Sequence, residues 1–210
     1  MKVEDMTIDE ARELVSNRLL WPFVRGFLWD FAPQVHPSWV EDPREAGSPR
    51  VKRHLLSSLG VEPCFHTFPK EDGSRILLLG GETIESVAKW LGALACAAAL
   101  RRVTGGAVVR GLKAALPGVY PEVFGYTMYF GELVPRRDAE AQSLQTVVVE
   151  EGCSLLLSAL SGLPPPLVSR LKLKLPKGFC DSAAPREMKL SGILKLLKLK
   201  FPEAYKICCS

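Results

Sequence analysis

The sequence predicts a mainly α-helical protein, a compact helical fold with at most a small hairpin or short strands. Hydrophobic residues make up 47% of the 210 residues and charged residues 24%, so the chain can bury a core. Apolar residues recur at helical spacing in several segments, whereas strict alternation is confined to a few positions. We expect either a single helical domain, 1–210, or an N-terminal lobe, 1–80, packed on a helical lobe, 81–210.

The N-terminal region predicts a helix followed by an aromatic segment. Thr7 and Glu10 have the spacing of a capping box, so a helix should begin at Thr7. Pro22 interrupts or restarts this helix because proline lacks a backbone N–H donor. Phe23–Phe31 then continues the chain as a segment rich in aromatic residues.

A loop, a short helix and a small hairpin are expected next. Residues 33–50 are rich in proline and glycine and predict a loop that Trp39 packs. Arg50–Leu59 predicts a short helix that stops at a glycine. Cys64–Pro69 and Ser74–Leu79 flank an Asp-Gly pair, which is typical of a tight turn between two strands.

The centre of the chain predicts two buried helices. Thr83 is placed to cap a helix over Ile84–Arg102. Its segment Trp90–Leu100 consists of hydrophobic and small residues only, and a helix of that kind is normally buried on all sides. Thr104 can cap a second helix that runs through Leu116.

Four further elements are predicted in the C-terminal half. Pro121–Phe130 and Ala139–Leu163 are expected to be helical. Leu171–Leu175 alternates leucine and lysine, which indicates a short strand. Glu187–Lys200 predicts an amphipathic helix with leucines on one face and lysines opposite.

Motifs for catalysis and cofactor binding are missing from the sequence. It contains no P-loop, dinucleotide-binding or nucleophile-elbow pattern. Cys64 and His66, with His54 upstream, lack the paired spacing of a zinc site. We therefore predict no catalytic residue, no cofactor and no metal, and we expect the six scattered cysteines to be reduced.

Charge and hydropathy predict a cytoplasmic protein with a basic C-terminal part. Met1–Glu13 lacks the apolar region of a signal peptide, and no long apolar run predicts a membrane-spanning helix. Residues 167–210 hold ten Lys and Arg against three Asp and Glu, a net charge of +7, so the rest of the chain sums to −3. The C-terminal lysines are either a solvated helix face or a surface for an acidic protein, lipid or nucleic acid.

Several segments in order along the chain resemble one known family, the YscK/SctK sorting-platform accessory proteins of type III secretion systems (injectisomes). The likeness rests on Trp90–Arg102 continued by Val103–Leu116, on His36–Trp39 and Lys52–Gly60 upstream, and on Arg170–Pro176 and Leu194–Pro202 downstream. The resemblance implies a protein-transport adaptor without catalysis, at the cytoplasmic base of the apparatus and peripheral to the inner membrane. Its expected partners are the cytoplasmic domain of the inner-membrane ring protein and the pod protein of the sorting platform, with no nucleic acid and no membrane insertion.

Candidate partner-binding residues follow from charge and exposure alone. Lys195, Lys198 and Lys200 form the basic face of the last predicted helix. His36 and Trp39 lie in the proline-rich loop, where Trp39 either anchors a partner or packs the loop on the core. A small enzyme with an unrecognised site and a basic-tailed, nucleic-acid-binding regulator are the two alternative functions.

Overall fold

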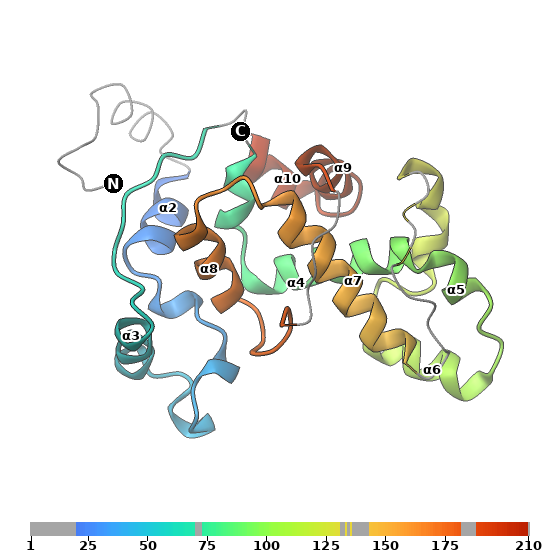
Figure 1. The fold of residues 1–210 in the computed structure, drawn as a ribbon, viewed down its shortest axis with the longest axis horizontal. Coiled ribbons are helices and arrows are strands. Elements are labelled where there is room, and N and C mark those ends of the chain that lie inside the picture. The colour runs from blue at the N-terminus through green and yellow to red at the C-terminus, as the bar shows by residue number, and fades with distance from the viewer. Residues whose placement is uncertain are drawn as a thin grey trace. The chain divides into compact units, whose positions relative to one another are not determined.

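The computed structural model describes residues 20–69, 73–130, 133, 135, 143–181 and 188–209. This described part is helical and contains no strand, so the mainly α prediction is confirmed. The helix predicted to begin at Thr7 lies outside it. The α-helices are α2 (Trp21–Leu28), α3 (Pro49–Ser58), α4 (Gly81–Ala95), α5 (Ala97–Arg101), α6 (Gly106–Ala115), α7 (Leu144–Ala159), α8 (Pro165–Leu173), α9 (Leu190–Lys200) and α10 (Pro202–Cys209), shown in Figure 1.

Short 3-10 helices connect several of these elements. They are η2 (Ala32–Gln34), η3 (Pro37–Trp39), η4 (Pro43–Glu45), η5 (Ser74–Leu78), η6 (Glu122–Gly125) and η7 (Thr127–Tyr129). None of the described helices has the length and apolarity that crossing a bilayer requires.

The chain divides into two compact units, each built from distant parts of the sequence. Unit 1 consists of Met1–Thr83, Gly162–Lys177 and Leu197–Ser210. Unit 2 consists of Ile84–Ser161 and Gly178–Leu196. Both α4 and α9 cross from one unit to the other along their length.

The core of unit 1 is the short helix η5. Its residues are buried, and it contacts α2, α8 and α10. The hairpin predicted from Cys64–Pro69 and Ser74–Leu79 is therefore wrong among the described residues. Every residue from Ser74 to Leu79 is buried, so the segment has no solvent face for an alternating strand to present. A 3-10 turn, which begins after Gly73 at φ +66°, buries all its sides instead.

The strand predicted for Leu171–Leu175 is also wrong, because most of this segment belongs to α8. Proline at the start of α8 favours the helix, since its missing N–H would be unpaired there in any case. Leu167 and Leu171 are both buried, one helical turn apart. Lys172 is exposed, but Lys174 is buried, as is Arg170, so the basic residues of this segment do not share the solvent face that alternation suggested.

Unit 2 is organised around α4 and α7, which are in backbone contact. A Cβ added at Gly92 would lie 1.7 Å from the oxygen of Val148, and one at Gly152 would lie 1.9 Å from the oxygen of Ala88. Of the segment Trp90–Leu100, which the sequence predicted to be buried on all sides, Trp90–Ala97 and Leu100 are buried, whereas Ala98 is exposed and Ala99 is half-buried. The predicted Ile84–Arg102 helix is nevertheless interrupted, because Cys96, with φ −89° and ψ 9°, separates α4 from α5.

Several other helices differ from the prediction in their boundaries or in their type. Thr83 does not cap α4, since that helix already begins at Gly81. Gly105, not Thr104, precedes α6. The expected Pro121–Phe130 helix is replaced by η6 and η7. The short α10, which starts at a proline, was not predicted.

Candidate partner-binding site

The predicted loop around His36 folds against the C-terminal end of α8. The His36 main-chain N–H donates to the oxygen of Leu173 at 2.9 Å. The side chain of His36 caps η3, because its Nδ1 accepts a hydrogen bond from the Ser38 N–H at 3.1 Å. The Ser38 hydroxyl in turn accepts from the Lys177 N–H at 2.7 Å. His36 is thus half-buried and holds the loop in place.

Trp39 is half-buried and attaches the same loop to the chain after α8. Its indole N–H donates to the main-chain oxygen of Leu175 at 2.9 Å, although the two residues are 136 positions apart. The ammonium of Lys177 lies 6.0 Å from the centre of the Trp39 ring. Trp39 therefore packs the loop and leaves part of its ring accessible.

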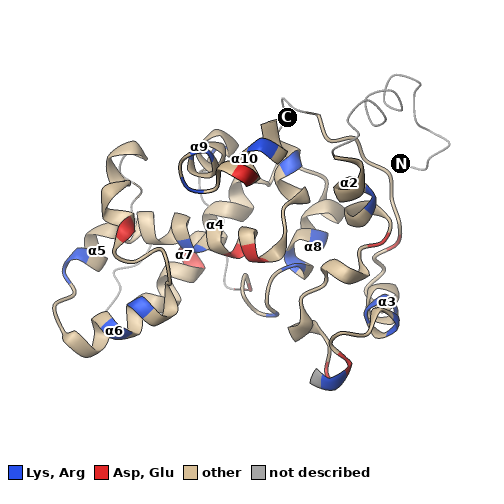
Figure 2. Cartoon of the chain, turned by 180° about the vertical axis from the view of Figure 1, so that it is seen from behind, with Lys and Arg blue, Asp and Glu red and all other residues tan. Residues whose placement is uncertain are grey.

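Lys195 and Lys198 are exposed on one face of α9, three residues apart. The Lys195 ammonium donates to the oxygen of Tyr129 and lies 5.7 Å from the centre of the Phe130 ring, all within unit 2. Lys198 lies 6.0 Å from the ring of Tyr205 within unit 1. Figure 2 shows the basic residues of α9 in blue.

Lys200 and the loop of His36 and Trp39 are not part of the exposed Lys195/Lys198 pair. Lys200 is half-buried at the end of α9. The structure thus brings His36 together with Trp39, and Lys195 with Lys198, as two separate pairs on different elements.

Unit 2 has an exposed apolar surface on η7 that the sequence did not predict. Met128 is 80% exposed and Tyr129 is 46% exposed on η7. Arg101 fixes this segment by donating to the hydroxyl of Thr127 at 3.1 Å. The aromatic composition of Pro121–Phe130 indicated that this segment carries large apolar side chains. The sequence predicted a helix there, however, and a helix would bury other side chains than η6 and η7 do.

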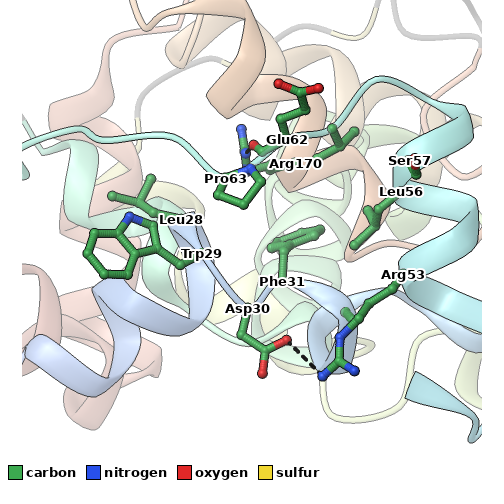
Figure 3. A pocket seen from close by; sticks show the side chains of 12 residues that line it. Leu28, Trp29, Asp30, Phe31, Arg53, Leu56, Ser57, Glu62, Pro63 and Arg170 are labelled. Atoms are coloured by element: carbon green, nitrogen blue, oxygen red, sulfur yellow. Dashed lines mark hydrogen bonds and ion pairs between the residues drawn. The ribbon is translucent and has the colours of Figure 1, made fainter. Parts of the chain in front are cut away.

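Unit 1 contains a cavity of about 270 Å³ between α3, the end of α2 and α8. Trp29, which is 43% exposed, lies on one side, and its indole N–H donates to the oxygen of Cys64 at 2.9 Å. Figure 3 shows Asp30 paired with Arg53, whose Nη2 is 3.6 Å from the Asp30 oxygen. Ser57 supplies the only hydroxyl among the lining residues, and no histidine or cysteine lines this cavity.

Arg170 lines the same cavity and is only 3% exposed. Its guanidinium donates to the main-chain oxygen of Glu62 and, at 3.5 Å, to that of Pro166. Its Nε has no hydrogen-bond partner. No carboxylate of the described residues forms an ion pair with it. A buried cation without a counter-ion is costly, so a carboxylate brought to this cavity would be stabilising.

Lys174 is a second buried cation of α8, and its role is structural. Its ammonium donates to the main-chain oxygens of Leu77 and Leu79, each at 2.7 Å, and lies 4.6 Å from the ring of Phe27. Burial lowers the pKa of Lys174 to about 7. The side chain thus fastens α8 to the end of η5 and is not available to a partner.

The described residues contain no group of three or more His, Cys, Asp or Glu side chains placed to hold a metal ion. The surfaces described above are a basic helix face, an exposed apolar turn, and a cavity with an aromatic side chain and two arginines. Tryptophan, methionine and arginine side chains are enriched at protein interfaces.

The chain matches a known protein family. The family model described as YOP proteins translocation protein K (YscK) matches residues 29–208. The matched range includes the cavity from Trp29 onward, the His36–Trp39 loop and all of α9. None of the curated proteins and none of the solved structures compared with the chain matches it.

Proposed function

The chain belongs to the YscK family of type III secretion proteins, and we propose that it is the cytosolic adaptor that links the inner-membrane ring protein to the pod protein of the sorting platform. The observation that carries this proposal is the family match, which spans residues 29–208. In this proposal the protein acts by binding alone, at the cytoplasmic base of the apparatus.

The distribution of exposed groups supports a protein with two partners. A linker needs one surface for each partner, and exposed apolar or basic groups occur in both units. Unit 1 carries Trp29 and the half-buried Trp39, whereas unit 2 carries Met128 and Lys195. Aromatic side chains, methionine and arginine are enriched at protein interfaces.

We assign two partner-binding roles to the predicted residues. Trp39 contributes the part of the residue that remains exposed, while His36 keeps the loop in its folded form. Lys195 and Lys198 attract an acidic surface, and Lys200 extends the same basic helix. Charges of this exposed kind act mainly on the rate of association and its salt dependence.

A capture experiment tests the proposal. The purified chain is immobilised, and the ring protein's cytoplasmic domain and the pod protein are applied separately at low and high salt. We expect both to be retained. The double variant Lys195→Glu/Lys198→Glu should weaken one of the two complexes more at low salt than at high salt. The matched control is Lys113→Glu on α6, an exposed lysine outside the proposed surfaces.

A further inference from the structure

We propose that the cavity of unit 1 binds an acidic segment of a partner protein, with one apolar side chain of that segment against Trp29 and a carboxylate facing Arg53 and Arg170. This inference rests on the proposed function, because it specifies one of the surfaces through which the adaptor binds.

The shape and lining of the cavity fit a single apolar side chain. Its volume of about 270 Å³ is of the size that a large side chain fills. Trp29, Leu56 and Phe31 supply apolar walls, and Figure 3 shows Phe31 between the other two. Trp29 is held by its hydrogen bond to Cys64 and by an edge-to-face contact with Trp21 at 6.0 Å. A rigid, exposed tryptophan beside a cavity is a typical interface centre.

The charges around the cavity select an acidic occupant. All charged residues of α3 are basic, namely Arg50, Lys52 and Arg53. The charged residues of α8 are basic as well, and Arg170 faces the cavity. Figure 2 shows both helices with blue residues and no red ones. These two helices flank the cavity, so its field favours negative groups.

Two acidic residues border the cavity without cancelling this field. Asp30 is already paired with Arg53, and the pair is exposed, with 63% of the Arg53 side chain accessible. Glu62 is exposed, and in Figure 3 its carboxylate points away from Phe31 and Leu56. A partner carboxylate can therefore displace Asp30 from Arg53 at little cost, since exposed pairs are weak.

Arg170 lines the cavity and has one donor without a partner. Its Nε is buried without a hydrogen-bond partner, although the rest of its guanidinium is held by the oxygens of Glu62 and Pro166. These two contacts hold the guanidinium in place, so binding a carboxylate costs little side-chain entropy. Charge-assisted hydrogen bonds of this kind are among the stronger ones in proteins.

The test uses two short fluorescent peptides that share a Leu-Phe pair and carry either glutamates or lysines around it. Binding to the full chain is measured by fluorescence anisotropy. We expect the glutamate peptide to bind at least about tenfold tighter than the lysine peptide, with an affinity that falls as salt rises. Absence of binding, or equal binding of the two peptides, overturns the proposal.

Matched variants locate the binding. Arg53→Glu should weaken the glutamate peptide about tenfold or more, whereas Arg50→Glu, on the same helix but outside the lining, should weaken it less than about threefold. Trp29→Ala should also weaken it, whereas Phe23→Ala should not, although Phe23 is 42% exposed and Trp29 is 43% exposed. Equal losses from Arg50→Glu and Arg53→Glu would show general electrostatic attraction and overturn the proposed site.

Different results would contradict the adaptor function and the acidic-segment site. If the ring and pod proteins bind Arg53→Glu and Trp29→Ala as well as the wild type, and the peptides show no preference, the acidic site is wrong and the adaptor function stands. If the glutamate peptide binds as expected and neither secretion protein is captured, the site is correct and the adaptor function is wrong. Circular dichroism of each variant confirms that it is folded.

Discussion

Gly92 of α4 and Gly152 of α7 face each other where the two helices meet backbone to backbone. A Cβ at Gly92 would lie 2.8 Å from the nitrogen of Gly152, and one at Gly152 would lie 3.1 Å from the nitrogen of Gly92. Even closer contacts would form with the main-chain oxygens of Val148 and Ala88. The apolar helix that is most prominent in the sequence is therefore a scaffold, because its tightest contacts leave no room for a ligand.

We expect Gly92→Ala to destabilise unit 2 by about 3 kcal/mol, since the added methyl group must push two backbones apart. Urea denaturation followed by circular dichroism measures the change. Gly125→Ala is the control, because no atom lies within 4 Å of a Cβ at that position. The control should stay within about 1 kcal/mol of the wild type. Equal stability of the two variants would contradict the close contact between α4 and α7.

Trp39→Phe should cost about 1 kcal/mol of unfolding free energy, because the partly buried oxygen of Leu175 loses its hydrogen bond. Trp29→Phe is the matched control. Its indole N–H also donates to a main-chain oxygen at 2.9 Å, but that bond is exposed and water can replace it. Trp29→Phe should therefore lose less unfolding free energy than Trp39→Phe. Urea denaturation of the two variants makes the comparison, and a larger loss for Trp29→Phe would be inconsistent with the fold of the loop.

The buried amine of Lys174 predicts that stability rises with pH above neutrality. Its pKa is about 7 in the folded chain, against an ordinary value of 10.5. Between these values the unfolded chain binds more protons, so the free energy of unfolding increases with pH, by at most about 1.4 kcal/mol per unit. Lys174→Met should remove this increase between about pH 7 and 9, whereas Lys172→Met, an exposed lysine of α8, should retain it. Denaturation curves with equal slopes for both variants would show that Lys174 is not the group responsible.

The buried thiols predict that their contribution to stability falls as pH rises, which is opposite to the effect of Lys174. Burial raises the pKa of Cys208 to about 12, and burial also raises the pKa of Cys64. The unfolded thiols titrate near 9.0, so the stability they contribute is complete below that pH and is lost as pH rises toward the folded values. The thiol contribution to the stability of the wild type should decline above about pH 9, against the continuing increase from Lys174, and Cys208→Ala should show less of this decline. Denaturation under reducing conditions measures both, and an identical decline in the variant would argue against Cys208.

Local patterns predicted the helices whose neighbours are close in sequence. The short helix expected at Arg50–Leu59, with a glycine after it, appears as α3, Pro49–Ser58, because its cap and its stop lie beside it. The helix expected at Glu187–Lys200 appears as α9 from Leu190, and Glu187 itself lies outside the described residues. In both cases apolar spacing within one segment was enough to identify the helix.

Where the prediction from the sequence was wrong, contacts between residues far apart in the chain determine the structure. The alternation of Leu171–Leu175 indicated exposed lysines, but Lys174 is buried where two carbonyl oxygens of Leu77 and Leu79 satisfy it. Those partners are more than 90 residues away, so no local pattern reveals them. The same holds for the cavity, whose lining joins Trp29 to Arg170. Spacing along the chain identified exposed lysines on α9 but could not assemble this site.

The central claim is that this chain links two secretion proteins, and a bridging experiment tests it most directly. The cytoplasmic domain of the ring protein is immobilised, and the pod protein is applied with and without this chain. We expect the pod protein to be retained only when the chain is present, in proportion to the chain bound. Retention of the pod protein without the chain, or no retention with it, would contradict the claim.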